Sequence, residues 1–136
     1  MKSLSEILEI IKADVEANIP DVLYAEGLSD FEKYIIGPTR DSELLTCGIM
    51  FDPAMSVDIT SRMYPVLYFL QLVQTEYLDA LLYADIFNDY ILNFDSYKIR
   101  ATLLNGIQTD IIPMERERAT LIYITATFSE PEDSCD

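Results

Sequence analysis

The sequence predicts an α+β protein in which two α-helices pack on one face of a mainly antiparallel β-sheet. Three features support this fold: an amphipathic helical pattern at the N-terminus, an apolar run followed by a second helical pattern, and alternating strand-like segments towards the C-terminus. The chain has 136 residues, of which 50% are hydrophobic, and this is enough for one folded core. We therefore expect a single domain over residues 1–136, in which residues 129–136 form a flexible acidic tail.

The first predicted helix covers about residues 4–18. Ser3 stands three positions before Glu6, the spacing at which the serine hydroxyl and the glutamate carboxylate cap each other's backbone amides. Apolar residues then recur at intervals of three and four, as one face of an amphipathic helix requires. These residues are Leu4, Ile7, Leu8, Ile11 and Val15. We expect this helix to end before Pro20 and its apolar face to pack on the sheet.

Short β-prone segments separated by breaker residues follow over residues 21–60. They are VLYAE (22–26), KYIIG (33–37), ELLTCGIMF (43–51) and MSVDIT (55–60). The third segment is the strongest strand candidate, and it ends at the Asp52-Pro53 turn. We interpret residues 27–41, with the breakers in and around them, as a partly mobile loop.

An apolar strand and a second helix are predicted next. Residues 64–73 are almost all apolar, which indicates a central strand. Thr75 is positioned to cap a helix over about residues 76–92. Apolar side chains recur there at helical spacing, with one acidic interruption at Asp85. They are Leu78, Leu81, Leu82, Ile86, Tyr90 and Ile91.

The C-terminal part of the chain is predicted to be strands. Segments 96–104 and 107–113 flank Asn105-Gly106, a dipeptide suited to both central positions of a tight turn, and so predict a hairpin. The last strand, predicted over residues 117–128, alternates between two faces. Ile122, Ile124, Ala126 and Phe128 share one face, and Leu121, Tyr123, Thr125 and Thr127 share the other.

The charge balance limits the classes of partner. The chain carries 24 acidic and nine basic residues, which gives a formal net charge of −15. A field of this sign repels phosphates and argues against general DNA or RNA binding. The acids either keep a tyrosine-rich surface soluble or line a surface past which a polyanion moves without adhering.

The sequence also gives an expectation for the compartment. The longest apolar run, of about ten residues, is shorter than the ~20 residues that span a bilayer, and the N-terminus lacks the apolar core of a signal peptide. We therefore expect no membrane contact. Cys47, in a strand-like segment, and Cys135, in the tail, do not read as a disulfide scaffold. These features place the protein in a reducing cytoplasm.

We find no pattern of residues that predicts catalysis or cofactor binding. The chain has no histidine, which removes the commonest general base and most zinc sites. Its four glycines form no phosphate-binding loop. Asp79, Asp85 and Asp89 are the best carboxylate cluster, but they lack the spacing of a calcium loop, and we interpret them as a solvated helix face. We expect no catalytic residue, no cofactor and no metal.

Alternating charges at residues 115–118 precede the last predicted strand. In one interpretation these charges prevent the end of the strand from pairing with other chains and form cross-strand pairs with nearby acids. In the other, Arg116 and Arg118 meet carboxylates of a neighbouring copy and fix the register of an interface. The residues expected at such a subunit interface are Glu115, Arg116, Glu117, Arg118, Asp85 and Asp89.

The order of these elements resembles that of the tail terminator, or tail-completion, proteins of tailed bacteriophages, which also occur in prophages and phage-derived contractile injection machines. The resemblance rests on three parts of the chain. They are the opening helix SLSEILEIIKADVEANIP with the strand DVLYA, the strand YPVLYFLQLV feeding the helix TEYLDALLYADIFNDYI, and the closing strands that end in ATLIYITATFSEPED. It covers nearly the whole chain and concerns element order rather than single residues.

The resemblance implies a structural protein of the virion tail, assembled in the host cytoplasm, and not an enzyme. Such a protein forms a ring, usually of six copies, that caps the finished tail tube, stops its polymerisation and offers a docking surface to the head–tail connector. Its implied partners are further copies of itself, the tail tube protein and the connector protein. DNA would pass through the acidic bore without specific binding.

Three other functions stay open at this point. The first is a head–tail connector or neck protein of the same particles. The second is a small-ligand-binding module or an enzyme with helices on a sheet, which would use carboxylates such as Asp85 or Asp89. The third is an acidic mimic of nucleic acid, which only the net charge supports.

Overall fold

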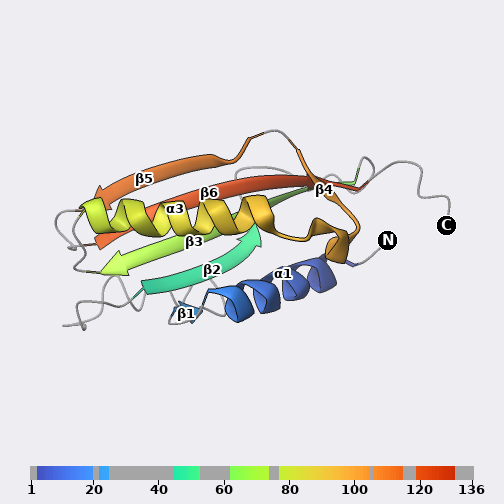
Figure 1. The fold of residues 1–136 in the computed structure, drawn as a ribbon, viewed down its shortest axis with the longest axis horizontal. Coiled ribbons are helices and arrows are strands. Elements are labelled where there is room, and N and C mark those ends of the chain that lie inside the picture. Colours follow the sequence, from blue (N-terminus) through green and yellow to red (C-terminus); the bar gives the residue numbers. More distant parts are fainter. Residues whose placement is uncertain are drawn as a thin grey trace.

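The computed structural model describes residues 3–19, 22–24, 45–52, 62–73, 77–104, 106–114 and 119–130. In chain order the elements are α1 (Leu4–Asn18), β1 (Leu23–Tyr24), β2 (Leu45–Phe51), β3 (Met63–Val73), α3 (Tyr77–Asn93), the 3-10 helix η1 (Ser96–Ile99), β4 (Thr102–Leu103), β5 (Gln108–Met114) and β6 (Ala119–Ser129). The protein is α+β, as predicted, and both helices lie on the same side of the sheet (Figure 1). Ser3 caps α1 by accepting a hydrogen bond from the Glu6 backbone amide, which is the serine half of the predicted reciprocal cap. The Glu6 carboxylate accepts from the Ser3 hydroxyl at 3.1 Å instead of from its amide.

The sheet is built around the pairing of β3 with β6. Its strand order is β1-β2-β3-β6-β4, and β5 also pairs with β6. All pairs are antiparallel except the short β1–β2 pair. Pro65 has no backbone N–H to donate, and β3 accommodates it because the pairing with β2 ends at the neighbouring Val66. The Pro65 carbonyl accepts a hydrogen bond from the Asp52 amide at 2.9 Å.

The main core lies between the helices and one face of the sheet. Tyr68 and Leu70 of β3 and Ile124 of β6 are fully buried there, and strand alternation brings their neighbours at intervals of two to the same face. α1 buries the side chains Ile7, Ile11 and Val15, as its apolar periodicity predicts. The alternation predicted for the last strand is confirmed, because its buried residues Ile122, Ile124, Ala126 and Phe128 all belong to this core.

The opposite face of the sheet carries a smaller apolar cluster. Leu67, Phe69 and Leu121 are buried in it. Phe69 of β3 stacks on Tyr123 of β6 with ring centroids 4.6 Å apart. Neither α1 nor α3 packs on this face, so both helices depend on the other face for their burial.

The apolar stripe predicted for the second helix is only partly right, because Ile91 is buried but half of the predicted residues are exposed. α3 turns Ala80, Ala84, Phe87 and Ile91 into the core, whereas three residues of the predicted stripe lie in solvent. These are Leu78, Leu82 and Ile86, which are 71%, 59% and 48% exposed. Since α3 has apolar side chains on more than one side, periodicity alone does not select the buried face. Ala80, Ala84 and Phe87 form the face of α3 that packs against the sheet, where α3 contacts β6.

The predicted hairpin at Asn105-Gly106 is also wrong. β4 and β5 both run antiparallel to β6, so they follow one edge in the same direction. Leu103 pairs with Phe128 and Gln108 with Thr125, so the chain between these two positions has two more residues than the facing part of β6.

The start of the predicted strand 96–104 is the turn η1. The Asp95 side chain caps this turn by accepting from the Tyr97 amide, and Arg100 closes it in the left-handed conformation with φ 56°. The strands predicted at 33–37 and 55–60 lie outside the described residues.

The observed orientation of α3 predicts unequal effects of two alanine substitutions on one helix. Phe87→Ala, at a fully buried position, should lower the free energy of unfolding by about 3–5 kcal/mol because it leaves a cavity under the helix. Leu82→Ala should change it by about 0.5 kcal/mol or less because this side chain is exposed. Urea unfolding followed by circular dichroism measures both. Equal losses would mean that α3 is rotated from this orientation.

Candidate functional site

Of the predicted interface residues, the structure describes Asp85 and Asp89. Both are exposed on α3, one helical turn apart. The Asn93 side-chain amide donates to the Asp89 carboxylate at 3.3 Å and to its backbone carbonyl at 2.8 Å. The hydrogen bonds of Asp89 therefore connect it to Asn93, at the C-terminal end of the helix.

The predicted residues Glu115, Arg116, Glu117 and Arg118 lie outside the described residues. The strand residues on either side of them, Met114 and Ala119, are opposite each other in the β5–β6 pair. Ala119 also pairs with Val73, the last residue of β3. This end of the sheet is thus the one from which the chain leads into α3.

The outer face of α3 combines apolar side chains with acids. Leu78, Leu82 and Ile86 are spaced by four residues and form an exposed apolar row, which we call the α3 ridge. Asp85 and Asp89 lie on the same outward side. The helix contains no lysine or arginine. Single exposed leucines are ordinary on protein surfaces, but an aligned row of them is typical of a contact surface.

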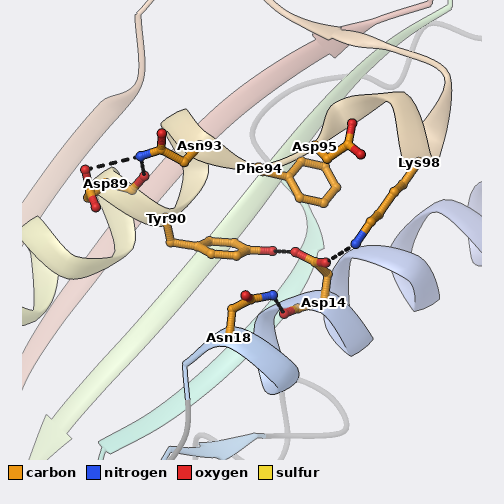
Figure 2. Close-up of a pocket in the computed structure, with 8 residues that line it drawn as sticks. All are labelled: Asp14, Asn18, Asp89, Tyr90, Asn93, Phe94, Asp95 and Lys98. Atoms are coloured by element: carbon orange, nitrogen blue, oxygen red, sulfur yellow. Dashed lines mark hydrogen bonds and ion pairs between the residues drawn. The ribbon is translucent and has the colours of Figure 1, made fainter.

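A cavity of about 250 Å³ lies where α1, the end of α3 and η1 meet (Figure 2). Its lining is polar apart from the rings of two aromatic residues. The lining residues are Asp14, Asn18, Asp89, Tyr90, Asn93, Phe94, Asp95 and Lys98. Sequence analysis missed this site, because Asp14 and Lys98 are 84 positions apart and nothing in either local pattern connects them.

Asp14 is the centre of the hydrogen bonds in this cavity. Figure 2 shows the Tyr90 side chain reaching from α3 to one carboxylate oxygen of Asp14, to which its hydroxyl donates. The Lys98 ammonium group donates to the other oxygen at 2.6 Å. The Asp14 side chain is 10% exposed and that of Lys98 is 50% exposed. One carboxylate thus joins α1 to both α3 and η1.

The surroundings of these groups shift their proton affinities. Burial alone raises the pKa of Asp14, but the hydrogen bonds from Lys98 and Tyr90 and the charge of Lys98 outweigh it and lower the pKa. The hydrogen bond to Asp14 and its charge raise the pKa of Lys98. Burial, followed by the bond to Asp14, raises the pKa of the Tyr90 hydroxyl, so this group stays protonated as a donor.

The cavity is electrostatically negative. α1 and α3 both end beside it, and neither has a basic residue in its last turn to offset the negative end of the helix dipole. Asp89 and Asp95 add negative charge, and Lys98 is the one basic residue in the lining. Among the described residues, no group of three or more acids or cysteines is placed to hold a metal ion. The cavity is also smaller than the roughly 300–1,000 Å³ typical of cofactor pockets.

Cys47 and Tyr64 are further buried side chains with ionisable groups. Cys47 is fully buried, and burial raises the pKa of its thiol, so it acts as a small apolar residue. Tyr64 donates to Glu130 at 3.3 Å, and Arg62 lies 3.8 Å from the same carboxylate. These contacts lie at the end of the β3–β6 pair where Met63 is opposite Ser129.

Comparison with protein-family models and with curated protein sequences finds no match for this chain. In the described part of the chain, no helix is both long enough and apolar enough to cross a membrane.

The Asp14 network predicts a pH-dependent loss of stability in the variant Asp14→Asn. At pH 7 the free energy of unfolding should fall by about 1.5–3 kcal/mol, because hydrogen bonds to a charged group are lost. The folded state lowers the pKa of Asp14 below its ordinary 3.8, so its contribution is present above that pH and is lost as the pH falls through the folded-state value. The difference between the two proteins should therefore shrink below about pH 3.8.

Urea unfolding between pH 7 and pH 3 measures this difference. Asp85→Asn, which removes the same charge at an exposed position of α3, is the matched control and should change stability by about 0.5 kcal/mol or less. A difference for Asp14→Asn that stays constant down to pH 3 would show that its charge is not the stabilising feature.

Proposed function

We propose that this protein is a structural subunit that forms a ring, caps the tail tube of a phage or prophage particle and ends its polymerisation. The α+β fold agrees with the resemblance in element order to tail terminator proteins. The observation that carries the proposal is the outer face of α3, where an apolar row and acids are exposed together. A surface of this composition supports a role in protein contacts.

Ring closure needs two different patches on each subunit that fit one another head to tail. We propose that Asp85 and Asp89 belong to one patch and Arg116 and Arg118 to the other. Arginine is suited to this role because its planar guanidinium group binds a carboxylate through two parallel hydrogen bonds. Glu115 and Glu117 would then lie at the edge of the same interface.

The proposed partners are the tail tube protein and the head–tail connector protein. The net charge of −15 supports a bore through which DNA passes without binding, because like charges repel. In this proposal the subunit is part of the virion tail and is assembled in the host cytoplasm. A connector or neck protein of the same particles shares these properties, and it would bind the portal side instead of the open tube end.

A small-ligand-binding module is the second candidate, and the cavity around Asp14 favours it. The size and negative character of the cavity suit a small organic cation. Acid–base catalysis there has less support, because a general acid needs a raised carboxyl pKa and that of Asp14 is lowered. Binding of spermidine, lost in Asp89→Asn, together with a monomeric protein, would favour this candidate over the ring.

The ring proposal predicts that the charge reversals Arg116→Glu and Arg118→Glu, made together, abolish assembly. Each contact then contains two glutamates in place of two arginines, so that attraction to Asp85 and Asp89 becomes repulsion. Light scattering at low salt should show rings for the original chain and monomers for the variant, and only the original should stop the growth of purified tail tubes. Unchanged assembly of the variant would remove these arginines from the interface.

A further inference from the structure

The described residues expose apolar side chains in more than one region of the surface. One group is the α3 ridge. Outside α3, two large apolar side chains are exposed in the described part of the chain, Tyr97 of η1 at 83% and Ile112 of β5 at 43%. Tyr97 is followed by Lys98, which Asp14 already binds, so this basic group is not available to the acids beside the ridge. Ile112 instead precedes Arg116, which the proposed ring pairs with those acids.

The Ile112 side chain points away from α3. It stands opposite Leu121 in the β5–β6 pair, and Leu121 belongs to the apolar cluster on the sheet face without helices. The neighbouring Ile111 packs against the main core, and the Thr109 hydroxyl donates to the Asn88 side chain of α3 at 3.2 Å. Ile112 and the α3 ridge therefore lie on opposite sides of one chain. A second copy is needed to bring them together.

β5 offers this surface through side chains rather than through its backbone. Among the described strands it pairs with β6 alone, so it lies at an edge of the sheet. Pro113 follows Ile112, and both are exposed. Proline is tolerated inside an edge strand where its nitrogen faces away from the sheet, so the outer edge lacks a backbone donor there. This disfavours the addition of a further strand and leaves side-chain packing as the form of contact.

The spacing of apolar and charged residues is similar on the two surfaces. Arg116 is four residues beyond Ile112, within about 14 Å along the chain. Leu82 of the α3 ridge precedes Asp85 and Asp89 by three and seven residues, which is about 4.5 and 10.5 Å along the helix. A contact centred on Ile112 and Leu82 thus leaves the proposed arginine–aspartate pairs within reach of one another.

A symmetric contact between two α3 helices is disfavoured by charge. It would bring acids against acids, because α3 contains no basic residue. A contact between α3 and the β5 side of another copy joins two different surfaces. Such a contact is head-to-tail and leads to a ring when its rotation closes.

We propose that Ile112 of one copy packs on Leu82 of the next copy and forms the apolar centre of the ring contact. This inference rests on the proposed function and deepens it, because it adds the apolar part of an interface that so far consists of charges. The pairs of arginines and aspartates then form the polar border. An apolar centre inside such a border excludes water from the contact.

Two variants, each damaging one surface, test this contact. Leu82→Glu damages the α3 ridge, and Ile112→Glu damages the β5 side. Both positions are exposed, so both variants should fold, which circular dichroism verifies. Each variant alone should be monomeric, with self-association weakened by at least about tenfold. Ala17→Glu, which adds the same charge at an exposed position of α1, is the control and should assemble like the original chain.

Mixing the two variants shows whether the damaged surfaces belong to one contact. One intact ridge and one intact β5 side remain in the mixture, so a one-to-one heterodimer should form and go no further. Native mass spectrometry distinguishes this heterodimer from monomers and rings. Monomers in the mixture, or rings formed by either variant alone, would overturn the inference.

Disulfide trapping tests the same contact without adding a charge. Leu82→Cys and Ile112→Cys are placed in one chain with Cys135→Ser, so that the one remaining native cysteine, Cys47, is buried. Oxidation should link the copies into a ladder of covalent oligomers, since a disulfide forms only between cysteines whose Cα atoms are within about 7 Å. Neither single-cysteine chain should form a ladder, and neither should Ala17→Cys combined with Ile112→Cys. Assembled rings that give no ladder would contradict the contact.

The two proposals fail in different ways in these experiments. Rings of the Leu82→Glu variant that still cap tail tubes would overturn the Ile112–Leu82 contact and leave the proposed function standing. Rings that are trapped through positions 82 and 112 but never bind tail tubes would overturn the proposed function alone. An original chain that is monomeric with and without tubes would overturn both.

Discussion

The antiparallel pairing of β3 with β6 is the constraint on which the rest of the structure depends. It joins eleven residues of each strand without interruption, from Met63 opposite Ser129 to Val73 opposite Ala119. Because strand side chains alternate, this single register decides which residues of both strands face the helices. A shift of one residue would put Tyr68 and Ile124 on opposite faces of the sheet, so that one of the two strands would turn its core side chains away from α1 and α3.

The two helices are held to this surface by different means. α1 buries three branched aliphatic side chains spaced by four residues, so its orientation follows from one narrow apolar stripe. α3 is apolar on several sides, and its orientation is fixed by the shapes of Ala80, Ala84 and Phe87 against the sheet. The Asp14 network then ties the end of α3 and the turn η1 to α1 through directional hydrogen bonds. These bonds hold the turn η1 in place.

Much of the fold could be predicted from local sequence patterns, since these patterns reflect burial on one face. The cap at Ser3, the stripe of α1, the apolar strand β3 and the alternation of β6 are all of this kind. The orientation of α3 could not be predicted, because its apolar residues satisfy more than one face and only the fit to the sheet selects among them. Asn105-Gly106 is typical of a hairpin turn, but β6 is long enough for β4 and β5 to continue along its edge in one direction. The Asp14 site depends on contacts between distant positions, which no local pattern contains.

For the proposed ring, the large negative charge bears on how copies assemble rather than on whether they do. At physiological salt, charges separated by more than about 8 Å are largely screened, so repulsion between copies with a net charge of −15 acts mainly on their encounter rate. In the proposed ring, the apolar area covered at the contact and the local pairing of unlike charges would determine how long two copies stay together. A subunit with slow encounters and a specific contact remains dispersed at low concentration. It assembles where another structure brings copies close together, because the effective concentration there offsets the slow encounter. For the proposed ring, the open end of a tail tube is such a structure, and the acidic surface then restricts ring formation to that place.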